Sequence, residues 1–443
     1  MSKKRMRLTK DPIPSLIKKI AIPASVGMFF NTMYNVTDTY FAGLLSTEAI
    51  AALSLSFPIF FIIMAVGIGM SQGINSLIAN ALGENNKAKA KRYAKQSFTF
   101  AIFISIGLTI IGLVVSPFLF QLLGAQGSYL NTSLEYMNII LLGTVFWLLT
   151  FVVNGVLSAQ GDTKTYRNAL IAGAILNVAL NPLFMFTFNL GVAGIALATT
   201  LIVFLELVYL IFVAIKTPVF NFKKPHEFKL KKKTVKEMLE QGIPATANMG
   251  MVALGIFIIT YFISDFGQSA VAAYGVSTRI EQIFLLPTIG LNMAALSLVG
   301  QNNGARKMGR VMESYKTLIK YGVYLMIVFG VVLYFTRTFL LGIFTEDQDV
   351  VLIGSQYLQI ASFILFVYPI LFVSTSTMLG LKKPIVSVWI NVYRQIIGAA
   401  IIFWLLAYVF GLGVYGIWIG VAITTVSSAA FSVWYVLNLI KKS

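Results

Sequence analysis

Four polar side chains interrupt segments of the sequence that are otherwise apolar. They are Asp38, Asn177, Asn181 and Thr199. At about 1.5 Å of helical rise per residue, each lies roughly 7 to 16 Å from the nearest predicted turn, so the four could meet at a similar depth. A carboxylate, two amides and a hydroxyl can bind a hard monovalent cation such as Na⁺, or hold a proton on the carboxylate. We predict a cation-coupling site, although the amides and the hydroxyl could instead only join helices through hydrogen bonds.

A second group of residues could form a substrate pocket. Asn31 and Tyr34 precede Asp38 by about two turns and one turn of a helix, while Tyr136 and Asn154 lie in the predicted span 130–157. Tyrosine has an apolar body and a polar tip, which suits the wall of a polar and aromatic pocket. From the residues alone, packing in the protein core explains these four positions equally well.

The composition defines the elements that must position these groups. Hydrophobic residues make up 58% of the 443 residues and charged residues only 11%, and the mean hydropathy is +0.83. A membrane-spanning helix needs about 20 apolar residues, and no ten-residue alternation typical of a membrane barrel occurs. We therefore predict an all-α membrane protein with twelve transmembrane helices, at roughly 14–42, 48–80, 93–120, 130–157, 163–188, 191–215, 238–264, 269–298, 312–343, 350–378, 385–410 and 413–439.

The sequence also contains an internal repeat. Ile22-Pro23-Ala24 recurs as Ile243-Pro244-Ala245, and Thr39-Tyr40-Phe41 recurs at the same spacing as Thr260-Tyr261-Phe262. Asp38 then corresponds to Ile259, so one copy places an ionisable group where the other is apolar. A charge in a membrane segment costs several kcal/mol unless it is neutralised or solvated, which makes Asp38 a functional candidate.

A further match suggests that the second copy is shorter. Gly83-Glu84-Asn85-Asn86 resembles Gly300-Gln301-Asn302-Asn303. Fewer residues separate these two segments along the sequence than separate the copies described above. The difference is close to one helical turn, so a helix could absorb it without changing its exposed face.

Basic residues predict the topology. All but three of the 34 Lys and Arg residues (Arg279, Arg337 and Arg394) lie at a terminus or in every second loop. Positive residues concentrate on the cytoplasmic side of membranes, so both termini and the linker 216–237 should be cytoplasmic. Two six-helix lobes, 1–215 and 238–443, then have the same orientation, as in parallel repeats with a binding site between the halves. The net charge of +18 therefore indicates topology and contact with membrane lipids, and we expect no nucleic-acid partner.

Other chemistry lacks the residues that it needs. The chain has no Cys, and its one His, His226, lies in the linker. No phosphate-binding G-x-x-x-x-G-K-[ST] motif and no Ser/His/Asp or Cys/His arrangement occurs. We predict neither an enzyme nor a cofactor, so the driving energy must come from an ion gradient, from the substrate gradient or from a partner.

Four further charged residues fall inside the predicted spans. Arg279 and Glu281 point to different helix faces, and Arg394 is a candidate partner for Glu281. Glu206 is near enough to the cytoplasmic end of its helix to extend to the membrane surface. We interpret these residues as structural.

Taken together, several motifs resemble the multidrug and toxic compound extrusion (MATE) family. They are YNVTDTYFAG in the first span, GENNKAKAKRYAKQS after the second, SAQGDTKTYRNALIAGAILNVALNP entering the fifth and GVAGIALATT in the sixth. The resemblance covers nearly the whole chain. It implies two six-helix lobes that export cationic or amphipathic compounds in exchange for Na⁺ or H⁺.

The resemblance also implies roles for individual residues. Asp38 matches the family's cation-site acid, Asn177 its amide ligand and Thr199 its hydroxyl, so a Na⁺ site at these three is one expectation. Related proteins often have Asp-Pro where this chain has Asn181-Pro182, and one carboxylate fewer favours H⁺ over Na⁺. The polar residues that match the family's cavity are Asn31, Tyr34, Tyr136 and Asn154.

The sequence thus predicts a multidrug efflux antiporter that works by alternating access, with its coupling site in the first lobe. We expect a monomer in the plasma (inner) membrane that transports organic cations or amphiphiles. The alternative is a flippase for a lipid-linked precursor, from the same superfamily. Its pyrophosphate head group would need an arginine-rich cavity, whereas the candidate charge in the first lobe is an acid.

Overall fold

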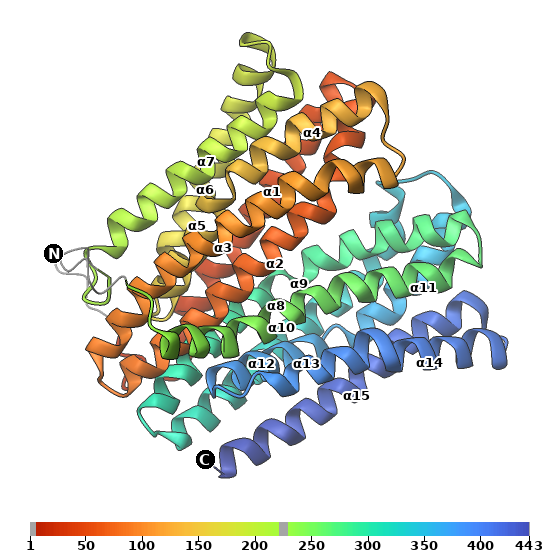
Figure 1. The fold of residues 1–443 in the computed structure, drawn as a ribbon. Helices are drawn as coiled ribbons and strands as arrows, with labels where there is room; N and C mark the ends of the chain where they lie inside the picture. Colours follow the sequence, from red (N-terminus) through yellow and green to blue (C-terminus); the bar gives the residue numbers. More distant parts are fainter. Residues whose placement is uncertain (1–5, 221–228, 443) are drawn as a thin grey trace. The chain divides into compact units, whose positions relative to one another are not determined.

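The computed structural model describes residues 6–220 and 229–442, and every regular element in these ranges is helical (Figure 1). The first half contains α1 (Ile13–Leu45), α2 (Thr47–Gly83), α3 (Lys87–Leu122), α4 (Gly127–Leu142), α5 (Thr144–Ser158), α6 (Lys164–Pro182), the π-helical turn η1 (Leu183–Thr187) and α7 (Gly191–Ala214). The second half contains α8 (Lys232–Ser264), α9 (Gln268–Gly304), α10 (Met308–Gly342), α11 (Gln348–Ile364), α12 (Val367–Gly380), α13 (Ile385–Val392), η3 (Tyr393–Ile397), α14 (Gly398–Trp404), η4 (Leu405–Val409) and α15 (Gly413–Lys442). The predicted all-α fold is confirmed.

These helices match the predicted spans. In the described ranges, ten helices are long and apolar enough to cross a membrane, and the number is twelve if two bent pairs each count as one span. The pairs are α4 with α5, bent by 44°, and α11 with α12, bent by 58°. Large apolar side chains cover the outer faces, among them Phe335, which is 78% exposed, and Val114, which is 73% exposed. Such surfaces suit lipid rather than water, so the chain is a multi-pass membrane protein.

The chain packs as two compact units. Val26–Thr246 form one, here called the amino-terminal unit; Met1–Ser25 together with Ala247–Ser443 form the other, the carboxyl-terminal unit. The lobes 1–215 and 238–443 follow the sequence repeat rather than this packing and stay a prediction. In the linker 216–237, residues 221–228, which include His226, lie outside the described residues.

Small residues allow close packing in the amino-terminal unit. There, α2 packs along α5, and α3 and α4 pack against both α2 and each other (Figure 1). A Cβ atom added to Gly155 of α5 would lie 2.5 Å from the backbone oxygen of Ser71 in α2. At Gly67 of α2 it would lie 2.3 Å from the ring of Phe151. Glycines of this kind let membrane helices approach until their backbones touch.

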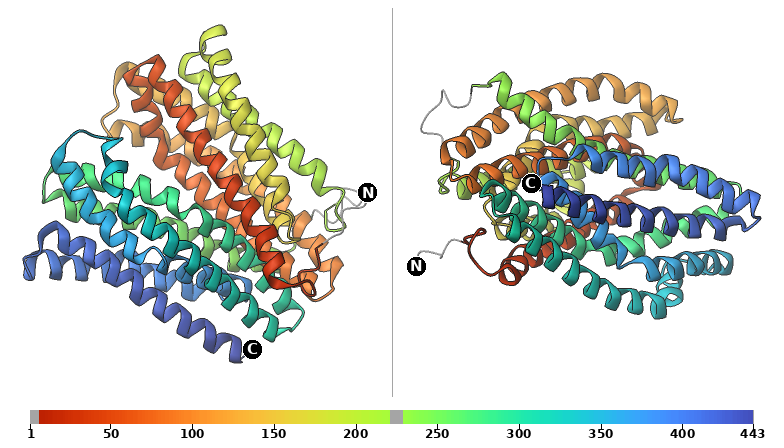
Figure 2. Two further views of the ribbon diagram at one scale, coloured as in Figure 1. Left: turned by 180° about the vertical axis from the view of Figure 1, so that it is seen from behind. Right: turned by 90° about the horizontal axis from the view of Figure 1, so that it is seen from below.

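The carboxyl-terminal unit is built around α9. This helix packs against α10, α11 and α12, and α15 lies along α12 and α14 (Figure 2). Ile17 and Ile20, from the start of α1, are buried in the same apolar cluster as Leu291 and Leu298 of α9. Arg310 fixes the segment before α1 by donating from Nη2 to the Asp11 carbonyl at 2.7 Å.

From α2 through the turn that follows it, the structure repeats at a constant spacing, and this spacing corrects one match made from the sequence. α2 and α9 are both 37 residues long, and their first residues keep the spacing of the Ile-Pro-Ala copies. After these helices, Asn85 and Arg306 have left-handed φ values of 56° and 55°, and they keep the same spacing. Gly83 therefore corresponds to Gly304, not to Gly300. The helices are equal in length, so the predicted shortening of the second copy by one helical turn is wrong.

The π-helical turns also repeat. η1 follows Pro182, and η4 occupies the equivalent place after Trp404. A proline inside a helix removes a backbone donor and favours such a defect. Trp404 has its N–H, so proline alone does not explain the turn. Close packing is common to both copies: a Cβ atom at Gly194 or Gly416 would lie 2.8 Å from the backbone of η1 or from Leu406 of η4.

We predict that Gly155→Ala destabilises the protein. The added methyl group meets the α2 backbone, which cannot rotate away, so overpacking should lower the unfolding free energy by about 1–3 kcal/mol. The control is Gly107→Ala, because a Cβ atom there has no neighbour within 4 Å. Thermal unfolding in detergent should show a lower midpoint for Gly155→Ala only, and equal midpoints for the two variants would contradict this account of α2–α5 packing.

Candidate functional site

The carboxylate of Asp38 lies at the centre of a buried polar cluster. Its side chain is 7% exposed. Asn177 and Asn181 donate through Nδ2 to Asp38 Oδ1 at 2.8 Å and 2.9 Å. Thr199 donates through Oγ1 to Asp38 Oδ2 at 3.2 Å. All four residues of the predicted cation-coupling site therefore lie together, although their role in coupling stays a prediction.

Helical spacing on three elements brings these groups into contact. Asn177 and Asn181 are one turn apart on α6 and share a face, and Asn181 Nδ2 also lies 3.3 Å from Asn177 Oδ1. Thr199 comes from α7, which packs against both α6 and η1. Gly194 permits this approach because its missing side chain leaves room for the η1 backbone. The cluster thus depends on the contact between α7 and the turn that follows Pro182.

The charges in the cluster are unbalanced. All three donors to Asp38 are neutral, and burial of an ionised carboxylate costs several kcal/mol without a partner charge. Asn181 Oδ1 is buried without a hydrogen-bond partner in the described part of the chain, so one acceptor beside the carboxylate is unused. A proton on Asp38, or a monovalent cation among these oxygens, would relieve the imbalance. Within the described residues, no three His, Cys, Asp or Glu side chains gather as a metal site.

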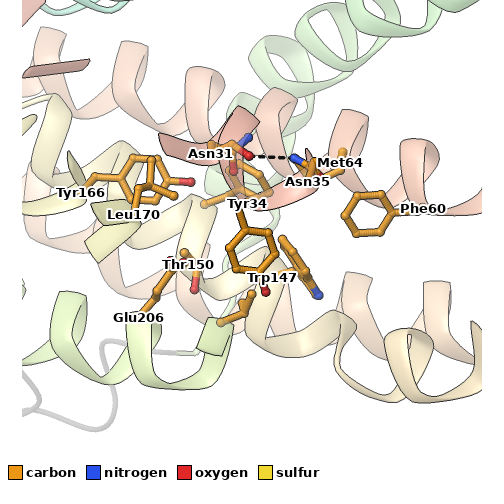
Figure 3. A pocket seen from close by; sticks show the side chains of 12 residues that line it. Asn31, Tyr34, Asn35, Phe60, Met64, Trp147, Thr150, Tyr166, Leu170 and Glu206 are labelled. Carbon is orange, nitrogen blue, oxygen red and sulfur yellow. Dashed lines mark hydrogen bonds between the residues drawn. The ribbon is translucent and has the colours of Figure 1, made fainter. Parts of the chain in front are cut away.

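A pocket lies in the same unit, and it contains some of the residues predicted to bind substrate (Figure 3). The pocket is partly open to its surroundings, and Asn31 and Tyr34 line it. Tyr136 and Asn154 are not among its lining residues. Tyr136 packs beside a cluster around Met185, and Asn154 accepts a hydrogen bond from Ser158 at 3.2 Å. A direct substrate role for these four residues stays a prediction.

Sequence reasoning missed other residues of this pocket. Trp147, Thr150, Tyr166 and Glu206 also line it. Glu206 was expected to extend to the membrane surface, but it is only 9% exposed, so that expectation is wrong. The available signal was spacing, because Glu206 follows Thr199 by about two helical turns on α7, which brings a side chain back to the same face.

The charged residues of the carboxyl-terminal unit are arranged differently. Glu281 Oε2 accepts a hydrogen bond from the Tyr357 hydroxyl at 2.6 Å. Arg394, in η3, is also buried and is close enough to Glu281 to interact with it electrostatically. Arg279 is exposed. Glu281 and Arg394 therefore interact at longer range, and the direct partners of Glu281 are the hydroxyl groups of Tyr357 and Tyr368.

A double-mutant cycle tests the cluster. Asn177→Ala should lower the unfolding free energy by about 1–3 kcal/mol, because it removes a donor from a buried carboxylate. The same change should cost much less in an Asp38→Leu background, where no carboxylate is left unpaired. Unfolding by a denaturing detergent measures both values, with the exposed Asn131→Ala as the control. Equal costs of Asn177→Ala in the two backgrounds would show that the contact contributes nothing.

Comparisons with known proteins agree with this fold. The MatE family model matches residues 23–183 and, a second time, residues 244–404. The multidrug export protein MepA of Staphylococcus aureus (strain NCTC 8325) is 30% identical over 370 residues, which are 80% of this chain and 77% of that protein. The probable multidrug resistance protein YoeA of Bacillus subtilis is 28% identical over 335 residues, which are 73% of this chain and 72% of that protein.

A solved structure extends the comparison to the whole chain. A MOP-superfamily transporter from Pyrococcus furiosus superposes with a TM-score of 0.93, at 24% identity, over 100% of this chain and 99% of its own. That likeness shows the fold. The double match of the family model covers most of the sequence and coincides with the structural repeat. The chain therefore belongs to the MatE family of multidrug and toxic compound extrusion transporters.

Proposed function

We propose that this protein is a multidrug efflux antiporter that exports cationic or amphipathic small molecules in exchange for protons. The observation that carries the proposal is a buried carboxylate, Asp38, with only neutral donors, one helical turn from a pocket residue, Tyr34. Relatives named for multidrug export support the direction and the class of substrate. The protein would act as a monomer in the plasma membrane, with both termini in the cytoplasm.

Proton uptake would change the hydrogen bonds of the cluster. The ionised Asp38 accepts three hydrogen bonds, from α6 and α7. Once protonated, it must donate one, so one present donor has to turn away or be replaced by an acceptor. Asn181 Oδ1 is a suitable acceptor because it has no hydrogen-bond partner within residues 6–220 and 229–442. Such a rearrangement would shift α1 against α6 and α7, and Tyr34 would carry the shift into the pocket.

Coupling between Asp38 and the pocket lets drug and proton exchange even if they bind to different atoms. If protonation of Asp38 favours a form of the unit that binds drug weakly, then bound drug must disfavour protonation by the same free energy. Drug and proton then compete for one unit while they touch different atoms. When the protein alternates between its two open forms, this linkage lets the drug leave the cell as a proton enters.

The donor arrangement favours H⁺ over Na⁺ as the coupling ion. Hard cations are held by oxygen atoms, whereas Asn177 and Asn181 present N–H groups to the carboxylate. Sodium binding would require both amides to turn their oxygens inward. The amide at position 181 also leaves Asp38 as the only carboxylate of the cluster. The alternative of a lipid-precursor flippase has no support from the pocket, whose charged group is an acid.

We predict that Asp38→Asn abolishes gradient-driven export and leaves the protein folded. The amide keeps the shape of the carboxylate but cannot take up a proton at neutral pH. Efflux of a fluorescent organic cation from proteoliposomes should fall to the level of protein-free liposomes, with an unchanged elution profile in detergent. In the control, Ile259→Asn at the repeat-equivalent position should keep the single coupling site intact. Wild-type rates in Asp38→Asn would overturn the coupling role.

The driving ion can be identified by separating the two gradients. Efflux should persist when Na⁺ is replaced by a large organic cation at fixed pH, and it should stop when the proton gradient is collapsed. Asn181→Asp should introduce dependence on Na⁺, because it restores a second carboxylate oxygen ligand. Wild-type efflux that needs Na⁺ and survives collapse of the proton gradient would contradict the proton mechanism.

A further inference from the structure

The pocket of the amino-terminal unit contains polar groups without partners. Trp147 Nε1 and Thr150 Oγ1 are buried and form no hydrogen bond with any described residue, and the buried Tyr34 hydroxyl has only Thr199 near it as a side-chain partner. All three residues line the pocket. Buried polar atoms in native proteins nearly always have a partner. Several unpartnered atoms around one cavity therefore mark the place of a ligand.

Glu206 is the charged member of this group. It is more than nine-tenths buried and lies in the pocket wall with Thr150 and Tyr166 (Figure 3). Burial acts on its carboxyl group with no hydrogen bond or opposite charge to offset it among the described residues. Its Oε1 lies over Gly173, where a Cβ atom would come within 2.4 Å. An acid in such surroundings needs a positive partner or a proton.

Glu206 differs from Asp38 in what surrounds it. Asp38 has three donors and does not line the pocket. Glu206 lies about 10 Å along α7 from Thr199, by helical rise. The unit thus has one carboxylate held by protein donors and one that faces open space. The second is placed to contact a ligand.

The rest of the pocket indicates the class of ligand. Aromatic side chains dominate one side, where the rings of Phe60 and Trp147 are 5.2 Å apart in an edge-to-face arrangement. Aromatic faces attract organic cations, and a carboxylate beside them adds a direct charge contact. A small inorganic cation would need several oxygen ligands instead.

We propose that Glu206 is the anionic contact for the positive charge of an organic cation bound in this pocket. Tyr34 and Trp147 provide ring faces beside that charge. The proposal rests on the proposed export of organic cations and assigns the residue that selects for charge. It separates substrate recognition, at Glu206, from ion coupling, at Asp38.

The test compares a charged probe with an uncharged one. Tetraphenylphosphonium carries a permanent charge, and triphenylphosphine oxide is a neutral molecule with similar rings. Binding to the full-length protein in lipid nanodiscs should weaken by about tenfold or more for the cation in Glu206→Gln, which corresponds to about 1.4 kcal/mol. Affinity for the neutral probe should not change. Glu206→Asp, which keeps the charge, should retain much of the cation affinity, and the exposed Glu135→Gln should retain all of it.

Three results of the binding assay would overturn the assignment. They are equal affinity of the wild type and Glu206→Gln for the cation, no saturable cation binding by the wild type, and parallel loss of both probes in Glu206→Gln. The last result would show that Glu206 only shapes the pocket. The binding assay uses no gradient, so charge-selective binding at Glu206 can be found even if Asp38→Asn shows that the proposed antiport is wrong. Conversely, proton-driven export that is unaffected in Glu206→Gln would keep the antiport and reject this assignment.

Discussion

The structure depends on the cost of placing a charge inside a membrane. A lipid-embedded backbone must satisfy its own hydrogen bonds, which is why the described elements are helices. Side-chain charges cannot be satisfied in that way. Asp38 is stabilised by three neutral donors from α6 and α7, while Glu206 has a pocket beside it and no donor among the described residues. These two solutions to one physical problem suit two roles, ion exchange and ligand contact.

The internal repeat separates scaffold from chemistry. Both copies contain long first and second helices, left-handed turns at equivalent places and a π-helical turn against a glycine. Ile259, which corresponds to Asp38, is also buried, and it packs in an apolar cluster with Ile263 and Phe403. The same backbone therefore accommodates either an acid or an apolar side chain. The coupling proposed for one unit therefore needs only a few substitutions on a geometry that both units share.

Asp38 lies on α1 and Glu206 lies on α7, and a hydrogen bond between Thr199 and Asp38 joins these two helices. This contact gives the proposed linkage between proton binding and drug binding a physical basis. Thr199 and Glu206 share α7, and Asp38 and Tyr34 share α1. A change in the hydrogen bonds of Asp38 can therefore move pocket residues through rigid helical segments, without a chain of intermediate contacts. Glycines at the α2–α5 and α7–η1 contacts place these backbones against each other.

The sequence by itself determined the helical class, the spans, the repeat and the convergence of Asp38, Asn177, Asn181 and Thr199. These features follow from local periodicity and from depth along a helix, which spacing alone encodes. Only the tertiary structure decided that Gly83 corresponds to Gly304, that Tyr136 and Asn154 lie off the pocket, and that Glu206 faces into it. The rotation of a helix about its axis depends on its neighbours. Depth could therefore be read from the sequence, but the direction of each side chain could not.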